Sequence, residues 1–112
     1  SFEPSRIPAW LAPVQVKILP ISDKFADYAK DVLLKLKKWD IRAEIDDRNE
    51  KIGKKIRDTE LMRVPYMLVV GEKEASEGKI SVRRQGKGDL GAKNVDEFLQ
   101  ELVAEIKDRR AD

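Results

Sequence analysis

The hydrophobic positions of the chain follow two different periods in turn, and this order predicts an α/β fold. Apolar and polar residues alternate over 14–18 and again over 41–45, which is the pattern of a half-buried strand. Between these segments, apolar residues recur at steps of three and four over Phe25–Trp39, which predicts an amphipathic helix. A strand, a crossover helix and a second strand in this order predict a parallel pair of strands.

The central stretch, residues 46–71, repeats this pattern with a shorter helix. Ile52 and Ile56 lie four residues apart among lysine and arginine, so we expect a short helix that buries these two and is otherwise basic. Pro65 then precedes the unbroken apolar run Tyr66–Val70, which suits a strand covered on both faces at the centre of a sheet. The turn before the helix contains three residues typical of turns and helix caps, Asp46, Asp47 and Asn49.

The last third of the chain predicts an antiparallel strand and a final helix. Gly71 and Gly78 bracket a polar segment that we interpret as a hairpin turn leading into a strand at 80–83. The glycine-rich loop QGKGDLG at 85–91 has room for a short edge strand, and Asn94 is a suitable cap for the final helix. We expect one face of that helix to enter the core, with six apolar residues: Val95, Phe98, Leu99, Leu102, Val103 and Ile106.

The chain is long enough for one domain, and its first residues differ in character from the rest. With 112 residues it can build a single core. Residues 1–13 contain three prolines, so we expect an extended lead-in at the boundary of a longer polypeptide, followed by the α/β domain at 14–112. We expect Trp10 to pack on a neighbouring surface, and stacking on a nucleobase is the alternative role for its ring.

Composition excludes several classes of site. The chain contains no cysteine and no histidine, which removes thiol nucleophiles, disulfides, Cys/His zinc sites and imidazole acid–base catalysis. No apolar run approaches the roughly 18 residues of a membrane span, and no secretory signal opens the chain. We therefore expect a cytoplasmic protein with no membrane partner.

Catalysis by this chain alone is a poor interpretation of its remaining polar motifs. Asp46 and Asp47 could form a magnesium or acid–base pair, but adjacent strand residues point to opposite faces. QGKGDLG lacks the spacing of a phosphate-binding loop, and no helix follows it at once. Serine and threonine nucleophiles have no histidine partner. We expect no catalytic residue and no metal ligand here.

Positive charge is concentrated in two segments, although the net charge is only +2. Residues 48–63 carry six Lys/Arg against three Asp/Glu, and residues 79–93 carry five against one. If both segments border one face, they supply phosphate contacts, while Asn49, Glu74 and Arg83 supply groups that can read the edges of unpaired bases. Composition leaves open the alternative of a charge-rich, merely solvated surface.

Four sequence motifs favour the nucleic-acid-binding face over the merely solvated surface. They are WLAPVQV (Trp10–Val16), DDRNEKIGKKIR (Asp46–Arg57), VPYMLVVGEKE (Val64–Glu74) and SVRRQGKGDLG (Ser81–Gly91). In order and spacing, over about residues 9–107, the chain resembles the C-terminal anticodon-binding domain of bacterial-type threonyl-tRNA synthetases, which are class II enzymes.

The resemblance implies a fold and a set of contacts. The fold is an α/β, three-layer domain with a mixed, mostly parallel sheet of about five strands and three helices. The domain reads the second and third anticodon letters, G and U, of threonine tRNA. The positions that match base contacts are Asn49, Lys51, Glu74 and Arg83. We assign five further cations to the RNA backbone: Arg48, Lys54, Lys55, Arg84 and Lys87.

The resemblance also implies a parent enzyme, a threonine–tRNA ligase that is a homodimer. It would use ATP and Mg²⁺, with zinc at the amino-acid site, whereas we expect no cofactor and no catalysis in this domain, and no DNA partner. The alternative is a synthetase-like accessory paralogue that serves as a protein–protein or non-specific RNA platform.

Overall fold

A mixed sheet forms the middle layer of the molecule. The computed structural model describes residues 7–110. Its five strands lie in the order β2-β1-β3-β4-β5. In chain order they are β1 (Val16–Pro20), β2 (Ala43–Ile45), β3 (Tyr66–Val70), β4 (Lys79–Arg84) and β5 (Gly88–Asn94). Strand β1 pairs in parallel with β2 and β3, while β4 is antiparallel to β3 and β5. Only β4 therefore runs against the others, which confirms the predicted mixed, mostly parallel sheet.

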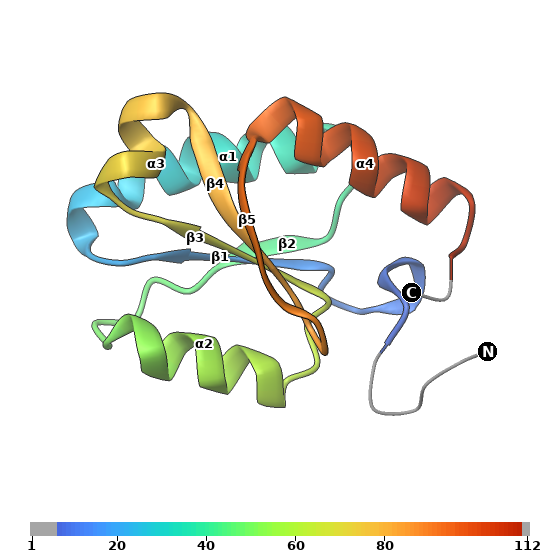
Figure 1. The fold of residues 1–112 in the computed structure, drawn as a ribbon, viewed down its shortest axis with the longest axis horizontal. Coiled ribbons are helices and arrows are strands. Elements are labelled where there is room, and N and C mark those ends of the chain that lie inside the picture. Colours follow the sequence, from blue (N-terminus) through green and yellow to red (C-terminus); the bar gives the residue numbers. More distant parts are fainter. Residues whose placement is uncertain (1–6, 111–112) are drawn as a thin grey trace.

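Helices cover both faces of this sheet and complete three layers (Figure 1). Two long helices, α1 (Ala26–Lys38) and α4 (Val95–Lys107), lie on one face, and α2 (Ile52–Leu61) lies on the other. The short helix α3 (Glu72–Glu77) joins β3 to β4, and two 3-10 turns precede β1 and α1, η1 (Ala9–Leu11) and η2 (Asp23–Phe25). The three predicted helices are present.

The segment around Gly71–Gly78 differs from its prediction. We expected a hairpin turn there, but the chain forms helix α3. The Glu74 carboxylate accepts a hydrogen bond from the Gly71 N–H at 2.8 Å and so caps the helix start. Gly78 ends the helix with a φ of 69°, a left-handed conformation that glycine adopts without a steric penalty. The two glycines therefore mark helix ends and not the ends of a turn.

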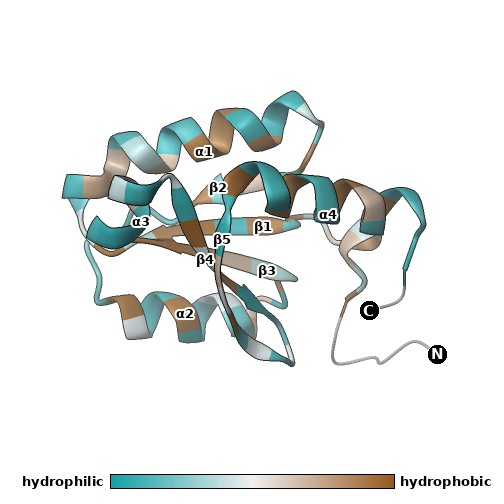
Figure 2. Ribbon diagram, turned by 45° about the horizontal axis from the view of Figure 1, so that its top comes forward, coloured by the Kyte–Doolittle hydropathy of each residue, from teal (hydrophilic) through white to brown (hydrophobic). Residues whose placement is uncertain are grey.

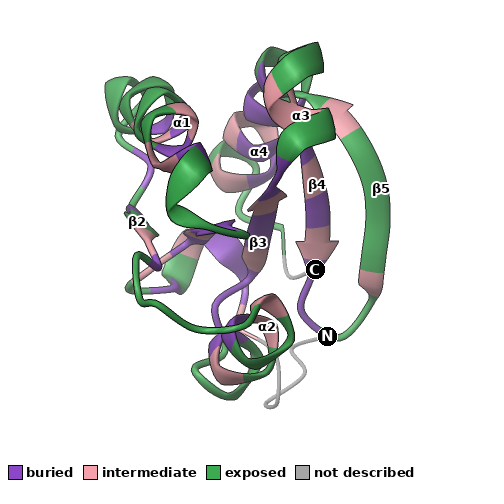
Figure 3. Cartoon of the chain, turned by 90° about the vertical axis from the view of Figure 1, so that its left-hand side faces the viewer, coloured by how far each residue is buried: buried purple, intermediate pink, exposed green. Residues whose placement is uncertain are grey.

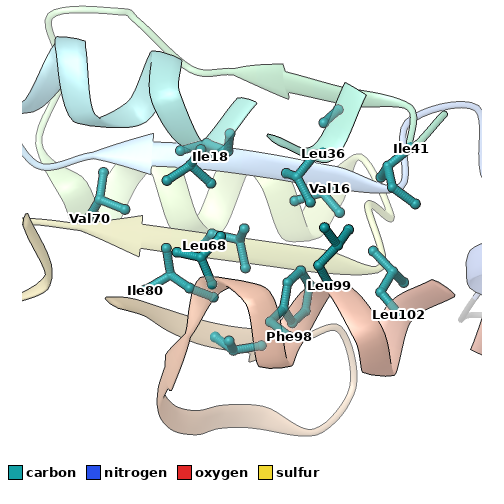
Figure 4. Close-up of a cluster of buried hydrophobic side chains, with 14 of the residues drawn as sticks. Val16, Ile18, Leu36, Ile41, Leu68, Val70, Ile80, Phe98, Leu99 and Leu102 are labelled. Carbon is teal, nitrogen blue, oxygen red and sulfur yellow. The ribbon is translucent and has the colours of Figure 1, made fainter. Parts of the chain in front are cut away.

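The apolar core lies between the sheet and the α1/α4 pair. The side chains of Ile18, Leu68 and Ile80, from β1, β3 and β4, are fully buried. Figure 4 shows them in one cluster with Leu36 of α1 and Leu102 of α4. Polar and apolar residues alternate along α1 in the way that one buried face requires (Figure 2). This is the face that the sequence pattern predicts.

Two predicted burials on the helices are wrong. Trp39 is 59% exposed, because α1 ends one residue earlier, at Lys38. On α2, Ile52 and Ile56 are only half-buried, and the buried positions are Lys55 and Thr59. Lys55 is buried because its ammonium group donates to two backbone carbonyls, that of Pro20 at the end of β1 and that of Asp46 just after β2.

The described part of the lead-in packs against the domain. Ala9 in η1 is fully buried, and the Gln15 side chain donates to its carbonyl at 2.9 Å. Trp10 is half-buried, and the Arg109 guanidinium lies 5.6 Å from the centre of its ring, which fits the expected packing role. Residues 1–6 of the predicted lead-in lie outside the described residues.

Candidate nucleic-acid interface

The alternation of side chains along β4 places Arg83 on the α2 side of the sheet. Ile80 and Val82 belong to the core beneath α1 and α4, so Ser81 and Arg83 point to the opposite face. A contact with α2 supports this placement, because Arg83 Nη2 lies 4.0 Å from Glu60 Oε1 on that helix. Arg83 thus shares a face of the sheet with the helix that follows Asn49.

The segment between β2 and α2 presents Asn49 and Lys51 to solvent. Both side chains are exposed, and within residues 7–110 neither forms a hydrogen bond or an ion pair. The Glu50 N–H donates to the Arg48 carbonyl at 2.9 Å, which closes a tight turn with Asn49 at its centre. The amide and ammonium groups are therefore available to a ligand.

Glu74 is held from two sides before any ligand arrives. Its Oε1 accepts from the Gly71 N–H at 2.8 Å, and its Oε2 accepts from the Ser81 hydroxyl at 3.0 Å. Each carboxylate oxygen can accept more than one hydrogen bond, so capacity remains for a nucleobase donor. The side chain is half-buried, and these two bonds fix its orientation at the edge of the sheet.

Arg83 keeps unused donors. Its side chain is 27% exposed and its one ion pair, with Glu60, is long at 4.0 Å. The Nε atom is buried and has no hydrogen-bond partner among the described residues. The buried Nε cannot reach a ligand, but the Nη donors, held only by this long ion pair, are suited to a planar acceptor such as the edge of guanine.

Arg48 and Lys54, expected at the RNA backbone, are instead paired with carboxylates. Arg48 donates to Asp46 and Asp58, and Lys54 Nζ lies 3.1 Å from the same Asp58 carboxylate. The hydrogen bonds from Arg48 lower the pKa of Asp46, and those from Lys54 and Arg48 lower the pKa of Asp58. These cations are exposed, but their charges are already compensated.

Two other expected backbone contacts lie inside the protein. Lys55 is 3% exposed, and its Nζ donates to the carbonyls of Pro20 and Asp46 at 3.0 Å each. Arg84 is also 3% exposed: it donates to the Pro65 carbonyl and lies 4.8 Å from the centre of the Tyr66 ring. In this conformation neither cation reaches a phosphate at the surface.

The environment of Arg84 is a buried polar cluster between β3, β4 and α4. Arg84 Nη2 lies 3.7 Å from Glu105 Oε2, and the Tyr66 hydroxyl donates to Glu105 Oε1. Burial and this carboxylate raise the pKa of Tyr66. The cluster fixes α4 on the sheet.

The fifth cation that was expected at the RNA backbone, Lys87, is exposed in the loop between β4 and β5.

The sequence did not point to the residues that hold these side chains, namely Ser81, Glu60 and the buried Asp46. Alternation along β4 was enough to place Ser81 beside Arg83. Its contact with Glu74, however, depends on helix α3, for which the sequence has no periodic signal. The carboxylate pairing of Asp46 is local, and an Asp-x-Arg spacing is the one signal that could have indicated it.

Residues 7–110 contain neither a candidate metal site nor a helix suited to spanning a membrane. No group of three His, Cys, Asp or Glu side chains there could hold a metal ion. None of its helices combines the length and the apolar character needed to cross a bilayer.

Comparisons with known proteins identify the family of this chain. Residues 15–105 match the model of the anticodon binding domain family. The chain is 56% identical over 101 residues to a threonine–tRNA ligase of Phocaeicola vulgatus, covering 90% of this chain and 16% of that protein. It is 59% identical over 99 residues to one of Cytophaga hutchinsonii, covering 88% of this chain and 15% of that protein.

A solved structure shows the same fold. The crystal structure of the RNA-binding domain of threonyl-tRNA synthetase from Cryptosporidium parvum superposes with a TM-score of 0.85 at 31% identity, covering 91% of this chain and 26% of that chain. The chain spans about one sixth of the ligases that it matches. It belongs to the anticodon binding domain family, in the form found in threonine–tRNA ligases.

Proposed function

We propose that this chain binds the anticodon loop of a threonine tRNA on the α2 side of its sheet. The observation that supports the proposal is the contact of Arg83 with Glu60 of α2, the helix that Asn49 precedes, together with the hydrogen bond from Ser81 on β4 to Glu74. Asn49 and Lys51 offer unpaired donors, Glu74 offers a fixed acceptor, and Arg83 offers Nη donors held only by a long ion pair. Such groups recognise unstacked bases of a single-stranded loop.

The distances along α2 allow contact with more than one nucleotide. Asn49 precedes the N-terminus of α2, whereas Arg83 faces Glu60 near its C-terminus. The helix has ten residues, so the two positions are roughly 15 Å apart along its axis. We assign Arg83 and Asn49 to different bases of the loop, with Lys51 beside Asn49 at the bases and Lys87 beside the backbone.

The role of the rest of the polypeptide follows from its relatives. We propose that the whole protein is a cytoplasmic, homodimeric threonine–tRNA ligase whose other domains bind ATP, Mg²⁺ and zinc. This chain has no cysteine or histidine for zinc, and its described carboxylates form no group of three that could hold a metal ion. Its contribution is to hold and identify the tRNA.

Titration of the chain with an anticodon stem-loop of threonine tRNA tests the proposal. We expect the wild type to bind more weakly when the central G is replaced. Arg83→Ala should reduce discrimination at one base by about 1–3 kcal/mol, since a guanidinium contact to a base edge is lost. Arg57→Ala is the matched control, because Arg57 is exposed on α2 and its substitution removes the same charge.

Two results would count against the proposal. Equal affinity of the wild type for unrelated RNA would favour the accessory-platform role. Equal losses for Arg83→Ala across all base variants would make Arg83 a phosphate contact and not a base reader.

A further inference from the structure

Asp46 is a buried carboxylate that anchors the start of the Asn49 segment. It is 4% exposed and directly follows β2. Its N–H donates to the Ile18 carbonyl at 2.9 Å, and its own carbonyl accepts from Lys55 Nζ at 3.0 Å. Lys55 also donates to the carbonyl of Pro20 at the end of β1. The residue is thereby tied to the sheet and to helix α2.

Arg48 closes the turn onto this anchor. Its Nε donates to Asp46 Oδ1 at 2.9 Å and its Nη2 donates to Oδ2 at 2.8 Å, while the Arg48 N–H donates to Oδ1 at 3.2 Å. Two parallel bonds between a guanidinium and a carboxylate fix relative orientation as well as distance. The remaining nitrogen, Nη1, reaches Asp58 Oδ2 on α2 at 3.0 Å. All three guanidinium nitrogens are therefore used within the protein.

The consequence is a turn whose shape is set before RNA arrives. Asn49 lies between Arg48, fixed by Asp46 and Asp58, and Glu50, whose N–H donates to the Arg48 carbonyl. A segment that is ordered in advance loses less conformational entropy on binding. A carboxylate beside the proposed RNA contacts would repel phosphates, whereas its three hydrogen bonds to Arg48 fit a role in holding the turn.

We propose that Asp46 and Arg48 are positioning residues that orient Asn49 and Lys51 toward the bases, and that Arg48 is not itself a phosphate contact. The proposal rests on the function proposed above and adds a specific cause for its selectivity. It also gives opposite predictions from the simple electrostatic account, in which each cation of this segment attracts the RNA backbone.

The two accounts predict opposite effects of Asp46→Asn on the affinity for RNA. It removes a negative charge, so an electrostatic role predicts tighter binding of every stem-loop. A positioning role predicts weaker binding of the cognate loop and about tenfold less discrimination at one anticodon base, within the range of a lost base contact. Asp47→Asn is the control, because this exposed neighbour carries the same charge and makes no contact with Arg48 among the described residues.

Arg48→Lys provides the second variant, which keeps the charge and removes the two-pronged pairing. A phosphate contact would survive it, because lysine also binds phosphate as a point charge. We expect it to lose discrimination as Asp46→Asn does. Thermal unfolding of each variant identifies the folded fraction, and affinities are compared per folded molecule.

The outcomes are distinct. Tighter binding by Asp46→Asn, or wild-type discrimination by folded Arg48→Lys, overturns the positioning role. If the wild type itself shows no discrimination between anticodon variants, the proposed function fails instead. Loss of discrimination in both variants, with the Asp47→Asn control unchanged, supports the proposal.

Discussion

The two faces of the sheet are covered by different chemistry. Beneath α1 and α4 the packing is mainly apolar, with Ile18, Leu68 and Leu102 among its buried members and one polar cluster around Arg84 and Glu105. On the α2 side, alternation along β1 and β3 places the fully buried Leu19 and Met67, but the buried positions of the helix itself are Lys55 and Thr59. Lys55 donates to backbone carbonyls, and the rest of α2 is exposed or half-buried (Figure 3). One face thus buries mainly hydrocarbon, whereas the other adds polar groups that are held by directional bonds.

This difference suggests how stability and recognition are separated in the molecule. Apolar burial contributes stability without needing exact directions. Hydrogen bonds and paired charges contribute less net stability, but they fix the orientation of the groups that make them. The face that holds the candidate base contacts is the face built from directional interactions. Substitutions on the two faces should therefore affect different measurements.

The largest effect should come from the apolar face. Leu68→Ala removes a fully buried side chain of β3 beneath α4 and leaves a cavity. We expect the free energy of unfolding to fall by about 2–5 kcal/mol, measured by urea denaturation. Leu61→Ala, at a side chain that is 77% exposed, is the control and should change it by less than about 0.5 kcal/mol. Similar losses for both would contradict the assignment of the core.

A smaller loss should follow on the α2 face. Lys55→Met keeps the length of the side chain but leaves the carbonyls of Pro20 and Asp46 without their donor. Unsatisfied buried acceptors cost about 1–3 kcal/mol, so we expect a loss of that size in denaturation. Lys54→Met, which removes only an exposed pair with Asp58, should cost under about 1 kcal/mol. If Lys54→Met were the more damaging change, Lys55 would have no structural role.

The smallest effect should be on the pH dependence of stability. Hydrogen bonds from Arg48 lower the pKa of Asp46 below its ordinary value of 3.8. A carboxyl group with a lowered pKa in the folded state stabilises that state above its unfolded pKa, and this contribution disappears as the pH falls through the folded pKa. We expect the unfolding free energy of Asp46→Asn to fall less steeply below about pH 4 than that of the wild type.

Denaturation curves at a series of acidic pH values measure this difference. Asp47→Asn, which changes an exposed neighbour, should keep the wild-type dependence on pH. Parallel curves for Asp46→Asn and the wild type would show that the pairing with Arg48 does not contribute to stability.

Much of the fold follows from the periodicity of the sequence, because burial of one face imposes that periodicity. The run Tyr66–Val70 predicts a central strand, and the six apolar positions of α4 predict its contact with the sheet. Helix α3 could not be predicted in this way. It is short and polar, and Glu74 caps it while also contacting Ser81 on the next strand.

The sequence also could not show which lysines and arginines are buried or paired inside the protein. A lysine or arginine in a basic stretch is ordinarily solvated, so Lys55 and Arg84 were assigned to RNA together with their neighbours. Their actual partners, the carbonyl of Pro20 and the carboxylate of Glu105, are distant in sequence and are brought close only by the fold. Asn49 and Lys51, which have no such partners among the described residues, remain as proposed contacts.

Mapping of backbone amide shifts by NMR during titration with the threonine tRNA stem-loop tests the central claim most directly. We predict that the perturbed amides cluster at Asn49–Lys51, Glu74 and Arg83, on the α2 side of the sheet. The lysines of α1, including Lys35 and Lys38, serve as an internal control with similar charge on the opposite face. Perturbations concentrated on α1 and α4, with none at Asn49 or Arg83, would contradict the account.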